Sequence, residues 1–220
     1  GINWKSYYWK TWISRVWYTE LGLSFGGYVT SYVKNTEKFN DTAWSNTGNL
    51  ITGRWGLAGC GTQVRDYHLV EILQVGNNTE EYDGTVWSNT GNLITGRERL
   101  AGCGPGLGII FGGYNGGKVN NTEKFDGTVW SNTGNLITGR YYLAGCGPEL
   151  GIIFGGNGGL DHTEKFDGTV WSNTGNLITG RYYLAGCGPE LGIIFGGNGG
   201  LDHTEKFDGT VWSNTGNLIT

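Results

Sequence analysis

One unit of 41 to 43 residues recurs along this chain, and this recurrence limits the fold more than any other feature. Four cysteines keep the same intervals as five tryptophans, and residues 123–179 are identical to residues 164–220. A repeat of this length is typical of a small four-stranded sheet or of a pair of helices. Glycine recurs every few residues and costs about 1 kcal/mol at each interior helical position, so the repeat favours strands. The tryptophans and cysteines that mark the period are Trp44, Trp87, Trp130, Trp171, Trp212, Cys60, Cys103, Cys146 and Cys187.

The unit that begins at residue 141 reads as four short strands, which we name a (141–147), b (150–156), c (163–166) and d (170–173). Strand a is rich in small residues, and strand b is apolar and ends in a double glycine. Asp167-Gly168 predicts a two-residue hairpin between c and d, with positive φ at both residues. Residues 176–181 (NLITGR) then lead into the next unit.

One such unit cannot bury both of its faces, but stacking between neighbouring units buries them. The sequence therefore predicts an all-β fold: a β-propeller of four-stranded antiparallel blades, with strand a lining the axis and strand d at the rim. We expect about five blades, or a piece of a six- or seven-bladed ring. The whole chain, 1–220, is predicted to be a single domain with a degenerate blade at about 1–47 and further blades at about 55–90, 98–133, 141–175 and 182–216.

A strand ending in a double glycine, then a charged strand and a tryptophan, resembles the kelch repeat of galactose-oxidase-like propellers. The double glycines that carry the resemblance are Gly26-Gly27, Gly112-Gly113, Gly155-Gly156 and Gly196-Gly197. The period here is shorter than the roughly 50 residues of a kelch repeat. The resemblance implies a propeller, but it implies neither copper nor catalytic residues, because a fold does not fix a function.

Two segments, residues 4–19 and 65–73, fit no repeat. If suitable codons are chosen for residues 4–19 and the first base is dropped, the shifted reading frame can encode GSPITGRLGLAGCGT. This peptide matches residues 48–62 at 12 of 15 positions. If codons are chosen for residues 65–73 and read from the third base, they can encode GLSFGGNT. This restores the GLSFGG motif of residues 22–27. We hypothesise that both segments are repeat sequence read out of frame, the alternative being ordinary divergence. Under this hypothesis they carry no selected function, and the native chain is longer and has further domains.

Composition excludes several classes of partner and site. The net charge of −4 argues against a nucleic-acid surface, which needs clustered Lys and Arg. No apolar run is long enough to predict a membrane-spanning helix. One cysteine per repeat suits either a thiolate ring around a soft metal or the packing of a small apolar side chain, and the absence of CxxC spacing favours packing. We expect no metal and no cofactor, and the subcellular location is not predicted.

The candidate ligand-binding residues lie in the loops between strands b and c and just before strand a. The histidines that follow Asp161 and Asp202 suit a metal ligand or general base, or else an ordinary exposed loop. The recurring arginines suit either a carboxylate ligand or a structural pairing with Glu37, Glu123 or Glu164. The candidates are Tyr114, Asn115, Asn157, Leu160, Asp161, His162, Asn198, Asp202, His203, Arg97, Arg140 and Arg181.

Near-identical repeats give equivalent surfaces instead of the single asymmetric constellation that an active site needs. We therefore expect a non-catalytic module that binds a protein or a glycan, with the b–c loops and the NLITGR connections presenting equivalent patches on the two faces. Two alternatives stay open: a purely structural spacer in a larger fibre, adhesin or virion protein, and a non-catalytic propeller part of a larger enzyme.

Overall fold

The computed structural model describes residues 14–17, 22–26, 30–40, 42–53, 58–60, 67–70, 76–103, 108–146, 151–187 and 192–218. These residues form five antiparallel sheets of four strands each, so the fold is all-β and repetitive. Each sheet is a meander, because its strands are hydrogen-bonded in the order in which they occur in the sequence. The described part of the chain contains no helix that is long and apolar enough to cross a membrane.

The strands are three or four residues long, which suits a unit of about forty residues. The first sheet contains β1 (Ser14–Trp17), β2 (Gly22–Phe25), β3 (Thr36–Phe39) and β4 (Trp44–Asn46), and the second contains β5 (Ala58–Cys60), β6 (Tyr67–Val70), β7 (Thr79–Tyr82) and β8 (Trp87–Asn89). The third contains β9 (Ala101–Cys103), β10 (Ile109–Phe111), β11 (Thr122–Phe125) and β12 (Trp130–Asn132). The fourth contains β13 (Ala144–Cys146), β14 (Ile152–Phe154), β15 (Thr163–Phe166) and β16 (Trp171–Asn173), and the fifth contains β17 (Ala185–Cys187), β18 (Ile193–Phe195), β19 (Thr204–Phe207) and β20 (Trp212–Asn214).

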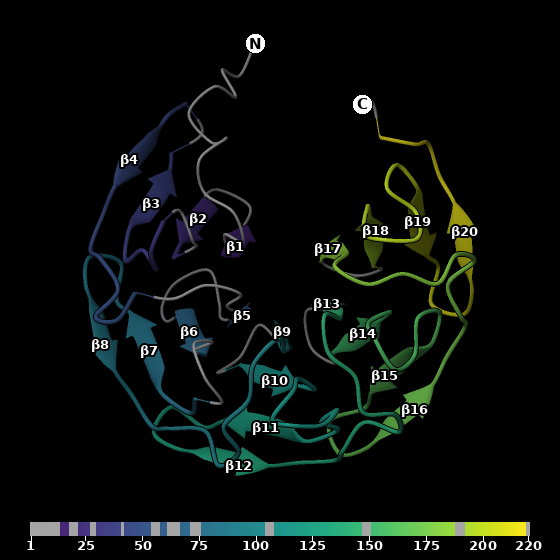
Figure 1. Cartoon of the computed structure of the whole chain (residues 1–220), viewed down its shortest axis with the longest axis horizontal. Helices are drawn as coiled ribbons and strands as arrows, with labels where there is room; N and C mark the ends of the chain where they lie inside the picture. The colour runs from purple at the N-terminus through teal and green to yellow at the C-terminus, as the bar shows by residue number, and fades with distance from the viewer. Residues whose placement is uncertain are drawn as a thin grey trace.

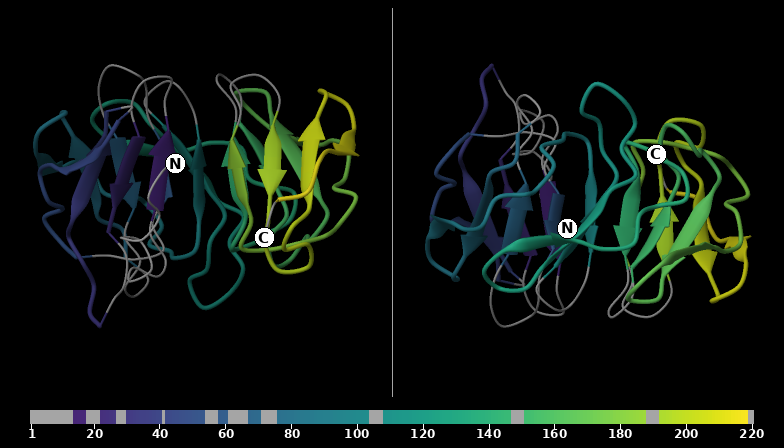
Figure 2. Two further views of the ribbon diagram at one scale, coloured as in Figure 1. Left: turned by 90° about the horizontal axis from the view of Figure 1, so that it is seen from above. Right: turned by 90° about the horizontal axis from the view of Figure 1, so that it is seen from below.

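The sheets follow one another along an arc (Figure 1). Strands β1, β5, β9, β13 and β17 lie on its inner side, where each contacts the next, and β4, β8, β12, β16 and β20 lie on its outer side. The strands run between the two faces of the arc (Figure 2). The first and last sheets border its open side, and among the described residues no strand of one contacts a strand of the other.

The predicted strand order is confirmed, and strand c matches its predicted range. Strand a is shorter than predicted, because Tyr142 has a φ of 56° and interrupts the extended backbone before β13. The hairpin between c and d is confirmed, but its predicted two-residue turn is wrong. Phe166 pairs with Trp171, which leaves a four-residue loop. In this loop only Gly168 has positive φ, and the Asp167 carboxylate accepts the backbone N–H of Thr169 and of Val170, each at 2.8 Å. The hydrogen bonds to the Asp167 carboxylate stabilise this loop, so Asp167 itself does not need the positive φ that the predicted two-residue turn requires.

The core lies between the sheets and not inside any one of them. One cluster joins Ala101, Cys103, Ile109 and Phe111 of the third sheet to Ile153, Phe166 and Trp171 of the fourth. The rings of Phe111 and Trp171 pack in a T-shaped arrangement with centroids 5.4 Å apart, and those of Phe154 and Trp212 do so at the same distance one sheet further on. We call the side of a sheet that packs on the following sheet its trailing face, and the opposite side its leading face.

Glycine in strand a lets neighbouring sheets approach this closely. A Cβ on Gly186 would lie 2.6 Å from Cε2 of Phe154 and closer still to its Cζ, and Gly145 faces Phe111 in the same way. The cysteines also pack at this interface: Cys103 is buried, and its Sγ is 2.7 Å from the place where a Cβ on Gly151 would be. For Cys103 and Cys146 the structure therefore supports the packing interpretation.

Hydrogen bonds between sheets reinforce the apolar packing. The indole N–H of Trp87 donates to the Thr36 hydroxyl at 2.9 Å, and Trp171 donates to Thr122 at the same distance. Trp130 donates to Thr79 at 3.3 Å, whereas the equivalent atoms of Trp212 and Thr163 are not bonded to each other.

Candidate functional site

The b–c loops and the connections between sheets lie on the same face of the arc. The backbone N–H of Arg140 donates to Val119 O at 3.2 Å, and that of Arg181 donates to Leu160 O at 2.8 Å. The expectation that these segments occupy two different faces is therefore wrong, because alternate connections of a meander return to the same edge of the sheet. We call this side the connection face. In the last three sheets it is formed by the b–c loops, residues 112–121, 155–162 and 196–203, and by the connections that lead into these sheets, residues 90–100, 133–143 and 174–184.

The three recurring arginines are buried beneath the connection face. Arg97, Arg140 and Arg181 are each 0% exposed, and each pairs with an equally buried glutamate: Glu123 at 2.7 Å, Glu164 and Glu205. Two of the predicted partners, Glu123 and Glu164, are thus confirmed. Burial lowers the pKa of Arg97 to about 10 while Glu123 acts in the opposite direction, so the guanidinium is charged at neutral pH.

Each Arg–Glu pair ties one sheet to the connection that enters it. Arg140 donates to His162 O at 2.7 Å and to Gly155 O at 3.2 Å, and Glu164 accepts the backbone N–H of Ile137 at 2.7 Å. In this pair the donors and acceptors that do not join the two side chains bond to the backbone, and both side chains are fully buried. These arginines therefore have the structural role that the sequence left open, and we leave them out of the ligand-binding proposal.

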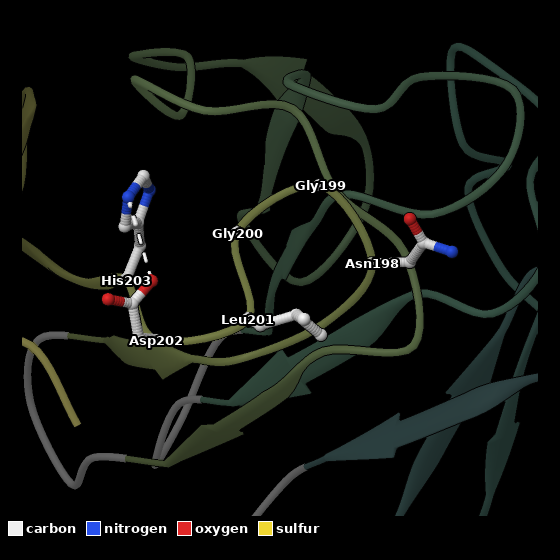
Figure 3. A pocket seen from close by; sticks show the side chains of 6 residues that line it. All are labelled: Asn198, Gly199, Gly200, Leu201, Asp202 and His203. Atoms are coloured by element: carbon white, nitrogen blue, oxygen red, sulfur yellow. Dashed lines mark ion pairs between the residues drawn. The ribbon is translucent and has the colours of Figure 1, made fainter. Parts of the chain in front are cut away.

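The remaining predicted residues lie on or beside the connection face. His162 and Asp161 are about half exposed, at 49% and 48%, with Nε2 3.9 Å from Oδ1, and His203 and Asp202 repeat this pair at 3.8 Å. Within the described residues, no group of three or more His, Cys, Asp or Glu side chains is placed to hold a metal. The loop 198–203 surrounds a hollow of about 510 Å³ that is open to solvent, with Asp202 and His203 together on one side and Asn198 on the other (Figure 3). Leu160 and Asn115 are exposed.

The structure adds a group that sequence reasoning missed, at the inner end of the connection face. Arg99, Tyr142 and Tyr183 occupy equivalent repeat positions and all have left-handed backbone conformations, with φ of 57°, 56° and 59°. They form a hydrogen-bonded series: the N–H of Tyr142 donates to Arg99 O at 3.0 Å, and the N–H of Tyr183 donates to Tyr142 O at 3.1 Å. This series crosses from the third sheet to the fifth.

The side chains of this series stack with neighbouring tyrosines. Tyr142 and Tyr183 have ring centroids 3.9 Å apart, and Tyr141 is 5.0 Å from Tyr142. The Arg99 guanidinium lies over Tyr142 at 5.1 Å and over Tyr114 at 5.6 Å. We call this group the Tyr–Arg cluster; its members are Arg99, Tyr114, Tyr141, Tyr142, Tyr182 and Tyr183.

The cluster is partly buried and partly open to solvent. The Tyr183 residue is 40% exposed and the Arg99 side chain is 29% exposed. Burial and a hydrogen bond with Tyr183 raise the pKa of Tyr142 well above its usual value, while Arg99 acts in the opposite direction. The Tyr142 hydroxyl is therefore neutral at physiological pH. The cluster presents an amphipathic surface with one cation, Arg99, which is paired with the Glu98 carboxylate at 3.2 Å.

The cluster also adjoins the predicted loop residues. Tyr114 and Glu98 exchange two backbone hydrogen bonds, at 2.7 and 2.9 Å, and Asn157 pairs with Tyr141 as Asn198 pairs with Tyr182. Tyr114, Asn157 and Asn198, one residue of each b–c loop, are thus each hydrogen-bonded to the residue that precedes a left-handed position. One sequence signal pointed to that position: the second repeat carries Gly56 there, and a glycine among equivalent residues suggests positive φ.

Comparisons with known proteins supply no family. No family model matches the chain. No curated protein matches its sequence. The kelch resemblance therefore stays a prediction.

Proposed function

We propose that this chain is a non-catalytic, kelch-like propeller module that binds a protein ligand through the Tyr–Arg cluster and the adjoining b–c loops. The radial order of the sheets, with strand a inside and strand d outside, supports a propeller. Near-identical repeats favour binding over catalysis, since they supply equivalent surfaces.

The observation that carries the proposal is the left-handed backbone at Arg99, Tyr142 and Tyr183. A non-glycine residue in this conformation costs about 1–2 kcal/mol, and such strain gathers at functional sites. The second repeat carries a glycine, Gly56, at the equivalent sequence position, so the repeat does not always place tyrosine or arginine there.

The side-chain types favour a protein ligand. Tyrosine and arginine are enriched among the few residues that dominate binding energy in protein interfaces. Tyrosine supplies a large contact area with little loss of side-chain entropy, and its hydroxyl keeps a polar atom at the rim. The exposed Leu160 and the Asp161–His162 pair would form the periphery of the same interface.

The test is a selection of peptides from a random display library on the immobilised chain, followed by affinity measurements on purified variants. Tyr142→Gly removes the ring and relieves the left-handed strain, so we expect it to fold but to lose about thirtyfold in affinity, equivalent to about 2 kcal/mol. Val170→Ser alters an exposed residue of a c–d loop, on the opposite face, and serves as the matched control.

Peptides that bind the wild-type chain and Tyr142→Gly equally would refute the proposal. Binding on a glycan array that is sensitive to Tyr142→Gly, with no peptide selected, would replace the protein ligand by a glycan. Thermal melts of both variants establish that a lost affinity is not a lost fold.

A further inference from the structure

Among the described residues, the trailing face of the last sheet differs in exposure from the trailing faces of the third and fourth sheets. Ile109 and Ile152 are 9% and 7% exposed because the following sheet covers them, whereas the equivalent Ile193 is 40% exposed. Phe111 and Phe154 are 0% exposed, whereas Phe195 is partly exposed. The same change occurs at Ala185, Gly196 and Thr204, whose equivalents in the fourth sheet are buried.

The loop beside this face is uncovered as well. Leu160 lies against the next connection, where its Cβ is 2.9 Å from the place of a Cβ on Gly180, and it is 45% exposed. Its equivalent, Leu201, is 78% exposed. The leading face of the same sheet is complete, with Ile194, Phe207 and Trp212 all buried. The exposure is thus confined to one face, which borders the open side of the arc (Figure 1).

The repeated interface specifies what fits on a trailing face. In the preceding interface, Phe154 packs on Gly186 and on Trp212 of the following sheet. A matching sheet therefore needs a glycine at the middle of its first strand and a tryptophan at the start of its fourth.

The first sheet of this chain lacks that glycine. In the fourth and fifth sheets, the glycine of the first strand pairs with the middle isoleucine of the second strand: Gly145 with Ile153 and Gly186 with Ile194. In the first sheet the same register pairs Arg15 with Ser24, so β1 has an arginine at the glycine position. Since even a Cβ on Gly145 or Gly186 would collide with the facing phenylalanine, a sheet with arginine there does not fit in the same geometry. The leading faces of the third to fifth sheets are already occupied.

We infer that the trailing face of the β17–β20 sheet is a docking surface for a further sheet of this same repeat, with glycine in its first strand, and not for the β1–β4 sheet. The surface continues the interfaces already present between the third, fourth and fifth sheets. Its apolar residues, Ile193 and Phe195, are equivalent to Ile152 and Phe154, and they would be buried by the same kind of contacts with a following sheet.

The experiment reads the accessibility of this face directly. Ile193→Cys is introduced as a reporter, and its alkylation rate by a maleimide is followed with peptide-resolved mass spectrometry, so that the native cysteines are distinguished. Ile152→Cys, at the covered equivalent, is the slow control, and Val211→Cys, exposed on a c–d loop, is the fast control. The alkylation rate of the reporter is then measured in a chain that is extended after Thr220 by one more copy of residues 180–220. It is also measured in a second extended chain, in which arginine replaces the glycine of the added copy that is equivalent to Gly186.

In the 220-residue chain we expect the thiol introduced by Ile193→Cys to be alkylated at a rate close to that of the fast control. The extension should slow alkylation by about tenfold or more, as burial under a packed element does, and the arginine-bearing extension should not. Failure of the extension to protect the reporter would overturn the inference. So would protection in the unextended chain, which in a monomer would mean closure by the first sheet and in a dimer would mean cover by a second copy.

Discussion

Replacing Gly186 with leucine should disrupt the interface between the fourth and fifth sheets. The new Cβ would lie 2.6 Å from Cε2 of Phe154, whereas carbon atoms in favourable contact are about 3.5–4.0 Å apart. Phe154 is fully buried and packed against Trp212, so it has little space into which to move. Overpacking costs roughly 1–3 kcal/mol, and a whole leucine side chain puts the expected cost near the upper end.

A smaller opposing effect comes from the unfolded state. Gly186 does not have positive φ, so its replacement also lowers the entropy of the unfolded chain, which stabilises the fold by about 0.4–1 kcal/mol. We therefore expect a net loss of about 2 kcal/mol. For a chain of this length that corresponds to a fall in Tm of roughly 4–8 °C, measured by circular dichroism.

Gly117→Leu is the matched control, because no atom lies within 4 Å of its added Cβ and its φ is not positive. Its effect should stay within about 0.5 kcal/mol. A double-mutant cycle with Phe154→Ala locates the collision: the cavity left by the ring should accept the leucine, so the combined loss should be smaller than the sum by about 1 kcal/mol or more. Equal melting temperatures for Gly186→Leu and Gly117→Leu would refute the close packing of strand a against Phe154 of the preceding sheet.

Three further predictions concern the polar contacts. Glu164→Gln leaves the Arg140 cation buried without its carboxylate, so urea unfolding should show a loss of about 3–5 kcal/mol, and a loss below about 1 kcal/mol would contradict the structural role of the pair. Backbone N–H donors of Val170 and Thr169 lower the pKa of Asp167 in the folded state. The contribution of this carboxylate to folding stability is therefore complete above its unfolded-state pKa of about 3.9, and it is lost as the pH falls through the lower folded-state pKa. An NMR titration of the carboxyl carbon should give a midpoint below about 3.9, and an ordinary midpoint would count against the cap. Trp171→Phe removes the donor to the buried Thr122 hydroxyl and should cost about 1–3 kcal/mol, with Thr122→Val recovering part of that loss; no recovery would mean that the bond contributes nothing.

The sequence predicted the fold where each residue's role depends on its neighbours in the chain or on its place in the repeat. The TEKF and VWSN strands follow from their places on either side of an Asp-Gly turn, and the glycine of strand a follows from the need of several units to converge. It predicted the turn type wrongly, because a four-residue loop capped by the Asp167 carboxylate is also compatible with Asp-Gly, and local sequence does not rank the two.

The candidate site was only partly predictable. The loop residues around Asp161 and Asp202 were found from turn chemistry, but Arg140 was placed among ligand-binding residues although it is buried against Glu164. A recurring arginine has the same spacing whether it faces solvent or a carboxylate, because the partner lies on a strand about 24 residues away.

The sequence by itself determined that this protein is a series of equivalent four-stranded sheets, because periodicity and glycine placement are properties of the chain. Only the tertiary structure decided that the b–c loops and the connections share one face, that Arg99, Tyr142 and Tyr183 are left-handed and stacked, and that the trailing face at Ile193 is uncovered. Identical repeats have identical local preferences. Their differences in exposure arise from whether a following sheet covers each of them, and that depends on how the sheets are arranged in space.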